Sequence, residues 1–131
     1  MAATAQPYAS TQNPEWPWPD SLDALKASPE HHILLFENER VRVLHTCIPP
    51  GERTAVHTHC WPGALYILKW SHFLRYDDKD NILVDSRKID AFETPPKVIW
   101  SAPLPPHSLE NIGNADLDII SVELKEPQPN L

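Results

Sequence analysis

The stretches Gly51-Glu-Arg-Thr-Ala-Val-His57-Thr-His59 and Pro105-Pro-His107-Ser-Leu-Glu-Asn111 carry the strongest signal in the sequence. Side chains alternate along a β-strand, so His57 and His59 are predicted to present both imidazoles on one face. His107, on a neighbouring strand, can then complete a set of nitrogen ligands for a first-row transition metal. The spacing therefore predicts a metal site held by His57, His59 and His107.

The residues around these stretches read as short strands separated by proline-rich turns. The chain has 15 prolines and only 3 glycines, and proline marks strand starts, edges and turns. The run 40–48 alternates, with Val41, Val43, His45 and Cys47 on one face and Arg42, Leu44, Thr46 and Ile48 on the other. Further strands are expected at 32–36, 64–69, 71–76, 82–84, 98–100 and 117–124. This pattern indicates a closed or double-sheet all-β fold.

The chain divides into three predicted parts. Residues 1–30 form an N-terminal arm, residues 31–126 form a β-barrel, and residues 127–131 form a C-terminal tail. A short helix is expected over 20–27, capped by Asp20 or Ser21. Trp16 and Trp18 are expected to pack on the domain or on a second subunit, because exposed tryptophans are unfavourable on a free tail.

Composition narrows the class of protein. A chain of 131 residues fits one domain of roughly 100–150 residues. The net charge of −7 argues against nucleic acid as a partner, because that binding depends on basic residues. No apolar run reaches the roughly 20 residues that cross a bilayer, so no membrane partner is expected. We also expect no secretory signal, because the first residues lack a basic and an apolar region.

Two cysteines do not make a disulfide framework, so a reduced, cytoplasmic location is predicted. Cys60 follows His59 directly and should point away from the histidine face of its strand. It is interpreted as a small hydrophobic residue rather than as a ligand.

The two histidine stretches resemble the two motifs of the cupin superfamily, G-x5-H-x-H-x3,4-E-x6-G and G-x5-P-x-G-x2-H-x3-N. More narrowly, residues 32–125 look like small single-domain bacterial cupins of unassigned activity; the similar segments are 37–44, 50–52, 57–59, 110–113 and 122–125. The resemblance implies a small cupin-type β-barrel of the jelly-roll kind (a double-stranded β-helix), a metal inside it, and a homodimer.

The chain departs from the cupin motifs at several positions. Gly63 or Ala64 stands where the glutamate ligand of the first motif is expected, so the usual carboxylate ligand is missing. The other departures are Lys69-Trp70 for the closing glycine of that motif, and Pro96, Ala102 and Leu104 in the second. The resemblance therefore supports the barrel and three histidine ligands, and leaves a fourth protein ligand open.

A three-histidine site leaves a divalent ion its full charge and leaves positions open for substrate and O2. Cupins that look like this, with a small residue in the glutamate place, include gentisate-type, diketone and thiol dioxygenases. The resemblance therefore implies a non-haem dioxygenase for a small organic molecule, with iron as the metal; zinc, manganese and nickel are alternatives. A non-oxidative isomerase, lyase or hydrolase, and a small-molecule-binding cupin without turnover, remain alternative hypotheses.

Other residues have predicted places around the site. Counting alternate positions predicts a pocket whose candidate lining residues are Trp61, Gly63, Leu65, Ile67, Arg75 and Trp100, with Tyr66 outward. Arg75 and Lys69 are candidates for binding an acidic substrate, since a buried cation needs an anionic partner. No residue is identified as a general acid or base. His31, His32, His45 and His72 are interpreted as structural or surface residues; for His45 and His72, a position facing the cavity is the alternative.

Overall fold

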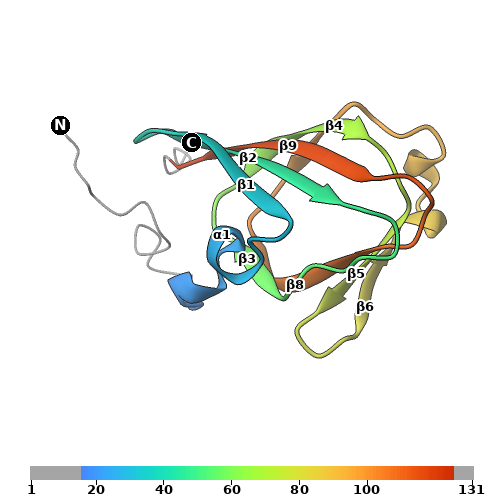
Figure 1. Cartoon of the computed structure of the whole chain (residues 1–131), viewed down its shortest axis with the longest axis horizontal. Helices are drawn as coiled ribbons and strands as arrows, with labels where there is room; N and C mark the ends of the chain where they lie inside the picture. The colour runs from blue at the N-terminus through green and yellow to red at the C-terminus, as the bar shows by residue number, and fades with distance from the viewer. Residues whose placement is uncertain (1–15, 126–131) are drawn as a thin grey trace, which may run out of the picture.

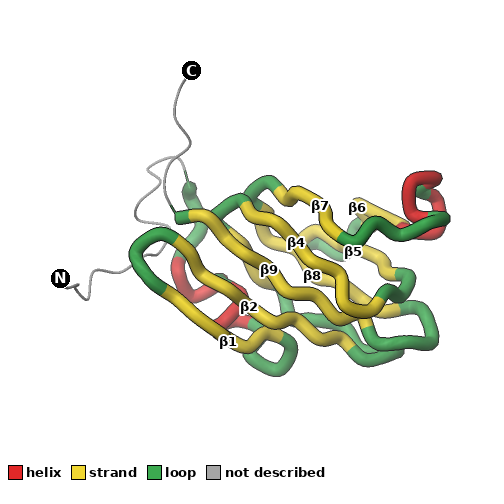
Figure 2. Tube along the Cα trace, turned by 90° about the horizontal axis from the view of Figure 1, so that it is seen from above, coloured by secondary structure: helices red, strands yellow, loops and turns green. Residues whose placement is uncertain are grey.

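Two antiparallel sheets face each other in the computed structural model, which describes residues 16–125 (Figures 1 and 2). The five-stranded sheet has the order β1-β2-β9-β4-β7, and the four-stranded sheet has the order β3-β8-β5-β6. The strands are β1 (His32–Glu37), β2 (Val41–Ile48), β3 (His57–His59), β4 (Gly63–Lys69), β5 (Phe73–Asp77), β6 (Ile82–Asp85), β7 (Val98–Ser101), β8 (Leu104–Asn111) and β9 (Leu117–Leu124). The predicted all-β fold is confirmed.

The alternation predicted in the run 40–48 is present in β2. Its buried side chains are Arg42, Leu44, Thr46 and Ile48, and the intervening ones are partly exposed. Along its whole length β2 pairs with β9, from Val41 opposite Leu124 to Ile48 opposite Leu117. The apolar core is formed by Ile48, Phe73 and Leu117, and therefore joins both sheets.

A tight turn leads from β2 toward the histidine strand. Gly51 adopts φ of 82°, which glycine tolerates without a Cβ penalty. Its backbone N–H donates to the carbonyl of Asn111 at 2.9 Å, so the turn is attached to the end of β8. The proline pair and the glycine at 49–51 thus end one strand and direct the chain into the other sheet.

The predicted helix over 20–27 is divided. A 3-10 helix, η2 (Asp20–Leu22), precedes the single turn of α1 (Ala24–Ala27). Asp23, and not the predicted Asp20 or Ser21, caps α1 by accepting from the Leu25 backbone N–H at 3.1 Å. The reason is that Asp23 leaves the helical conformation (ψ 143°), which restarts the helix after it. Two further 3-10 turns, η3 (Ser86–Lys88) and η4 (Asp90–Phe92), follow β6.

The residues before β1 pack on the barrel. Figure 1 shows α1 beside β3, and Asp23 forms a parallel bridge with Thr58 of that strand. Trp16 and Trp18 contact each other edge to face, with ring centroids 4.7 Å apart. Half of the predicted arm (residues 1–15) and the whole predicted tail lie outside the described residues. Within residues 16–125, none of the helices has the length and hydropathy needed to span a bilayer.

Candidate metal centre

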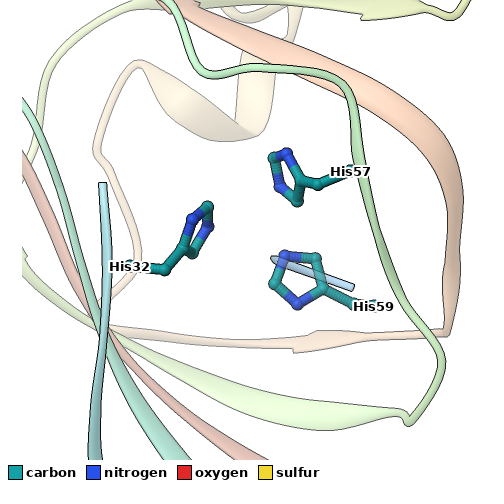
Figure 3. A group of neighbouring side chains, drawn as sticks. All are labelled: His32, His57 and His59. Carbon is teal, nitrogen blue, oxygen red and sulfur yellow. The ribbon is translucent and has the colours of Figure 1, made fainter. Parts of the chain in front are cut away.

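Three histidine side chains meet at one end of the barrel. His57 and His59 lie on β3, and His32 opens β1 in the other sheet. One ring nitrogen of each lies within 4.8 Å of the others, and Figure 3 shows the three rings turned toward a common space. The prediction that His57 and His59 share a face is confirmed by ring centroids 5.0 Å apart.

His107 of β8 lies beside this group. It is opposite His57 in the register of the two strands, and the two ring centroids are 4.4 Å apart. The His59 ring is farther away, at 5.7 Å, and His107 does not belong to the group within 4.8 Å. The structure therefore brings the three predicted histidines together, and ligation by His107 stays a prediction.

Hydrogen bonds hold all four imidazoles by the same nitrogen. Nδ1 of His32 donates to Ser28 O (2.9 Å), and Nδ1 of His57 donates to Ala55 O (2.7 Å). Nδ1 of His107 donates to Pro105 O (2.7 Å), and Nδ1 of His59 donates to Glu123 Oε2 (2.8 Å). Carbonyl and carboxylate oxygens only accept, so each Nδ1 carries a proton, and in a neutral ring Nε2 then keeps its lone pair. This is the arrangement in which outer hydrogen bonds orient histidine ligands around a metal.

Burial keeps the rings of His32, His57 and His107 neutral. It lowers the pKa of His32 to about 4 and that of His107 to about 3, with the electrostatic effect of the neighbouring His59 as the next cause in both. The pKa of His57 is also well below its usual range because of burial and the neighbouring imidazoles. Neutral imidazole is the form that binds a metal, so the donor set fits a divalent transition metal near neutral pH.

His32 was missed by the sequence analysis, which interpreted it as a structural or surface residue. The other three histidines of that set bond elsewhere: His31 to Glu52, His45 to Asp118 and His72 to Ser86. His32 differs because β1 pairs with β2 in the sheet that covers β3, which places its ring 4.6 Å from the His57 ring. No motif spacing contains that information.

The missing glutamate has a steric explanation. Gly63 lies opposite Glu123 in the pairing of β4 with β9. A Cβ atom on Gly63 would lie 2.4 Å from the backbone oxygen of Val122, so no side chain fits there. At Gly63, one of the two positions that align with the motif's glutamate, the backbone of β9 therefore leaves no room for a carboxylate.

Glu123 places a carboxylate behind the site instead. It is 3% exposed, accepts from His59, and accepts from Arg42 Nε at 2.8 Å. Arg42 in turn donates twice to Asp23, at 2.9 and 2.8 Å. Burial raises the pKa of Glu123, but the bonds and charges of His59 and Arg42 outweigh burial and leave the pKa below its ordinary value. Glu123 is thus an ionised partner of His59, which the sequence analysis did not identify.

A cavity of about 110 Å³ opens beside the histidines. Five of the six predicted residues line it: Trp61, Gly63, Leu65, Ile67 and Arg75. Trp100 was predicted wrongly, because Ile99 and Ser101 face the cavity while the Trp100 side chain lies on the outer face of β7 and is 59% exposed. Lys69 is also directed outward and contacts Asp116 at 3.9 Å.

The asparagine of the second motif has a structural place. Asn111 is fully buried and joins three segments through its amide. Its Nδ2 donates to Ile48 O and Ala115 O, and its Oδ1 accepts from Ser71 Oγ and Gly113 N. All four polar positions of this buried amide are satisfied, so Asn111 fixes the end of β8 rather than facing a ligand.

Comparison with solved structures identifies the fold. A cupin domain from Bordetella pertussis Tohama I matches with a TM-score of 0.55 and 17% identity over 72% of this chain and 92% of that chain. The polyketide cyclase RemF from Streptomyces resistomycificus matches with a TM-score of 0.51 and 19% identity, over 82% and 75%. An uncharacterised Klebsiella pneumoniae protein with a double-stranded β-helix domain gives 0.51 and 15%, over 75% and 80%.

No protein-family model and no curated protein matches the chain. The chain has the cupin fold, a double-stranded β-helix. Within that fold it carries three neighbouring histidines that can hold a metal ion.

Proposed function

We propose that this chain is a metal-dependent cupin enzyme that acts on a small organic molecule. The observation that carries the proposal is the convergence of ring nitrogens from His32, His57 and His59 within 4.8 Å. His107 is the fourth ligand in this proposal. Its Nδ1 is hydrogen-bonded to a carbonyl like those of the other rings, so its Nε2 remains available as a ligand atom. A divalent cation held by neutral imidazoles keeps its full charge and, when bound, polarises a substrate oxygen as a Lewis acid.

The protein's own residues prepare the site. The Nδ1 hydrogen bonds fix the orientation of each ring, and Glu123 keeps the proton of His59 on Nδ1. Apolar side chains, among them Leu65, Ile67 and Leu104, line the cavity and exclude water from it. Such a cavity strengthens every electrostatic interaction made inside it.

Non-oxidative chemistry, such as that of a lyase, isomerase or cyclase, is the reaction class that the geometry favours. His32, His57, His59 and His107 would together hold the ion, and four imidazoles would leave fewer positions for substrate and O2 than three. A dioxygenase is the second candidate, favoured by the closed glutamate position at Gly63.

Metal content tests the site. We expect the untagged protein to carry about one equivalent of a divalent transition metal by inductively coupled plasma mass spectrometry. The His57→Ala/His59→Ala variant should lose it. His32→Ala should weaken metal binding at least tenfold in a chelator competition, because it removes a ligand and not only an orienting bond. His45→Ala, whose imidazole bonds to Asp118 away from the cavity, is the matched control and should keep the metal.

The outcome separates the candidates. Turnover that is unchanged without oxygen supports non-oxidative chemistry, whereas iron together with O2 uptake supports the dioxygenase. Absence of metal in the wild type after reconstitution contradicts both, and leaves a small-molecule-binding cupin. Retention of metal by His32→Ala at wild-type affinity removes His32 from the ligand set.

We further propose that the protein is a cytoplasmic homodimer that pairs through β1. This strand is the edge of the five-stranded sheet, and the side chains of Ile33, Leu34, Leu35 and Phe36 are between 43% and 58% exposed. Four consecutive apolar residues on an open edge favour pairing with another strand. Analytical ultracentrifugation should give twice 14.9 kDa for the wild type and a shift toward monomer for Leu35→Lys. A wild-type monomer at micromolar concentration contradicts the proposal.

A further inference from the structure

Arg75 places a cation inside the cavity. It lies on β5 two residues after Phe73, and both side chains line the cavity. Across the strand pair Arg75 is opposite Leu109, and His107 is two residues before Leu109 on β8. The guanidinium therefore belongs to the same wall of the cavity as His107.

No group of the protein neutralises Arg75 among residues 16–125. Its Nε is buried without a hydrogen-bond partner, and no carboxylate of the described chain forms an ion pair with it. Two buried cations contrast with this partly buried one: Arg42 pairs with Asp23 and Glu123, and Lys125 pairs with Glu37. If Arg75 had a purely structural role, we would expect a carboxylate to pair with it in the same way.

The charge remains on Arg75 despite burial. Burial lowers the pKa of the guanidinium, but arginine stays protonated in proteins. The positive charge of Arg75 is also one of the causes that lower the pKa of His107, behind burial and His59. An unpaired charge that is partly buried is unfavourable, and an anion that enters the cavity offsets this cost.

The other residues that line the cavity indicate the chemical character of the rest of the ligand. Trp70 packs against Phe92 and Phe73, with ring centroids 4.9 and 5.8 Å apart, and all three rings line the cavity. Glu123, the acidic residue of the lining, is already paired with Arg42 and accepts a hydrogen bond from His59. The cavity therefore offers one cation, apolar walls and no free negative charge.

We propose that the substrate is a small organic carboxylate with an apolar body, whose carboxylate binds Arg75 while the body lies against Trp70, Phe73 and Phe92. This substrate class rests on the proposed function of the histidine site, because it describes what that site acts on. Arg75 is the specificity-determining residue, and it selects the anion over a neutral analogue of the same shape.

Binding of matched carboxylates and amides tests the proposal. The probes are acetate, butyrate and benzoate, each paired with its neutral amide, since the cavity of about 110 Å³ limits ligand size. Isothermal titration calorimetry is run in a buffer free of chloride and acetate, which compete as anions. We expect the wild type to bind at least one carboxylate at least tenfold more tightly than its amide. Arg75→Met should lose this preference, and Arg75→Lys should retain part of it.

Two further measurements keep the test decisive. Arg75→Met in the absence of ligand should melt a few degrees higher than the wild type, because it replaces an unpaired buried charge by an apolar chain of similar length. Arg87→Met, which alters an exposed arginine paired with Asp85, is the matched control and should change neither property. Equal binding of carboxylate and amide, an unchanged preference in Arg75→Met, or no binding across the panel would overturn the inference.

Metal content measured on each variant separates this inference from the proposed function. If the wild type holds metal but shows no preference for carboxylates, the substrate class is wrong and the metal site stands. If the wild type holds no metal and still selects carboxylates through Arg75, the anion site stands and the enzyme proposal fails.

Discussion

Gly63→Ala should remove more than about 3 kcal/mol from the free energy of unfolding, because the new Cβ meets backbone rather than a movable side chain. The built Cβ lies 2.4 Å from the Val122 oxygen, at the first pair of the ladder between β4 and β9. Relief requires this end of the two strands to separate, which breaks the ladder where it begins. Urea unfolding followed by tryptophan fluorescence measures the loss, and we expect much of the protein to be insoluble or unfolded at 37 °C.

Gly51→Ala is the matched control for this change. Gly51 has φ of 82°, but nothing lies within 4 Å of a Cβ built on it, so only the backbone conformation is penalised. We expect a cost of about 1 kcal/mol there. A Gly63→Ala protein as stable as Gly51→Ala would contradict the steric account of the missing glutamate. Gly63→Glu should likewise fail to restore a carboxylate ligand.

Glu123→Ala should damage both stability and metal binding. The substitution leaves Arg42 Nε and His59 Nδ1 buried without their acceptor. Removing one partner of a buried ion pair costs roughly 3–5 kcal/mol. Removing the bond that orients a histidine ligand weakens metal binding roughly 10–100-fold. Urea unfolding of the metal-free protein measures the first effect, and competition with a chelator measures the second.

Two variants separate the roles of Glu123. Glu123→Gln keeps one acceptor oxygen and should show smaller losses of both kinds. Glu110→Ala removes a carboxylate that accepts from Tyr76 and does not line the cavity, so it should cost about 1 kcal/mol and leave metal affinity unchanged. If Glu123→Ala binds metal with wild-type affinity, Glu123 does not position His59.

Strand periodicity was sufficient for much of the fold. The alternation in β2, the range of β9 and the shared face of His57 and His59 all follow from the two-residue period of a strand. The same reasoning predicted the wrong side-chain direction for Trp100 in the short β7. Three of its four residues are apolar, Val98 and Trp100 outward and Ile99 inward, and the polar Ser101 also faces the cavity, so no polar residue marks the outer face.

The parts of the site that were missed depend on pairing between distant strands. His32 reaches His57 because β1 lies at one edge of the sheet that covers β3, and Glu123 reaches His59 from β9 across 64 positions of the sequence. Neither contact is expressed in the local spacing of residues. A search limited to the motif therefore finds His57, His59 and His107 and not the residues that surround them.

The histidines come from both sheets, and this has a consequence for assembly. His32 belongs to the five-stranded sheet, and His57, His59 and His107 belong to the four-stranded sheet. At the far end of β8, Asn111 already bonds to Ile48 of the opposite sheet. A metal ion bound by these histidines would link the two sheets at a second place. It would bind only to the closed barrel, and each tenfold rise in free metal above the dissociation constant would then add about 1.4 kcal/mol to the resistance of the barrel against opening.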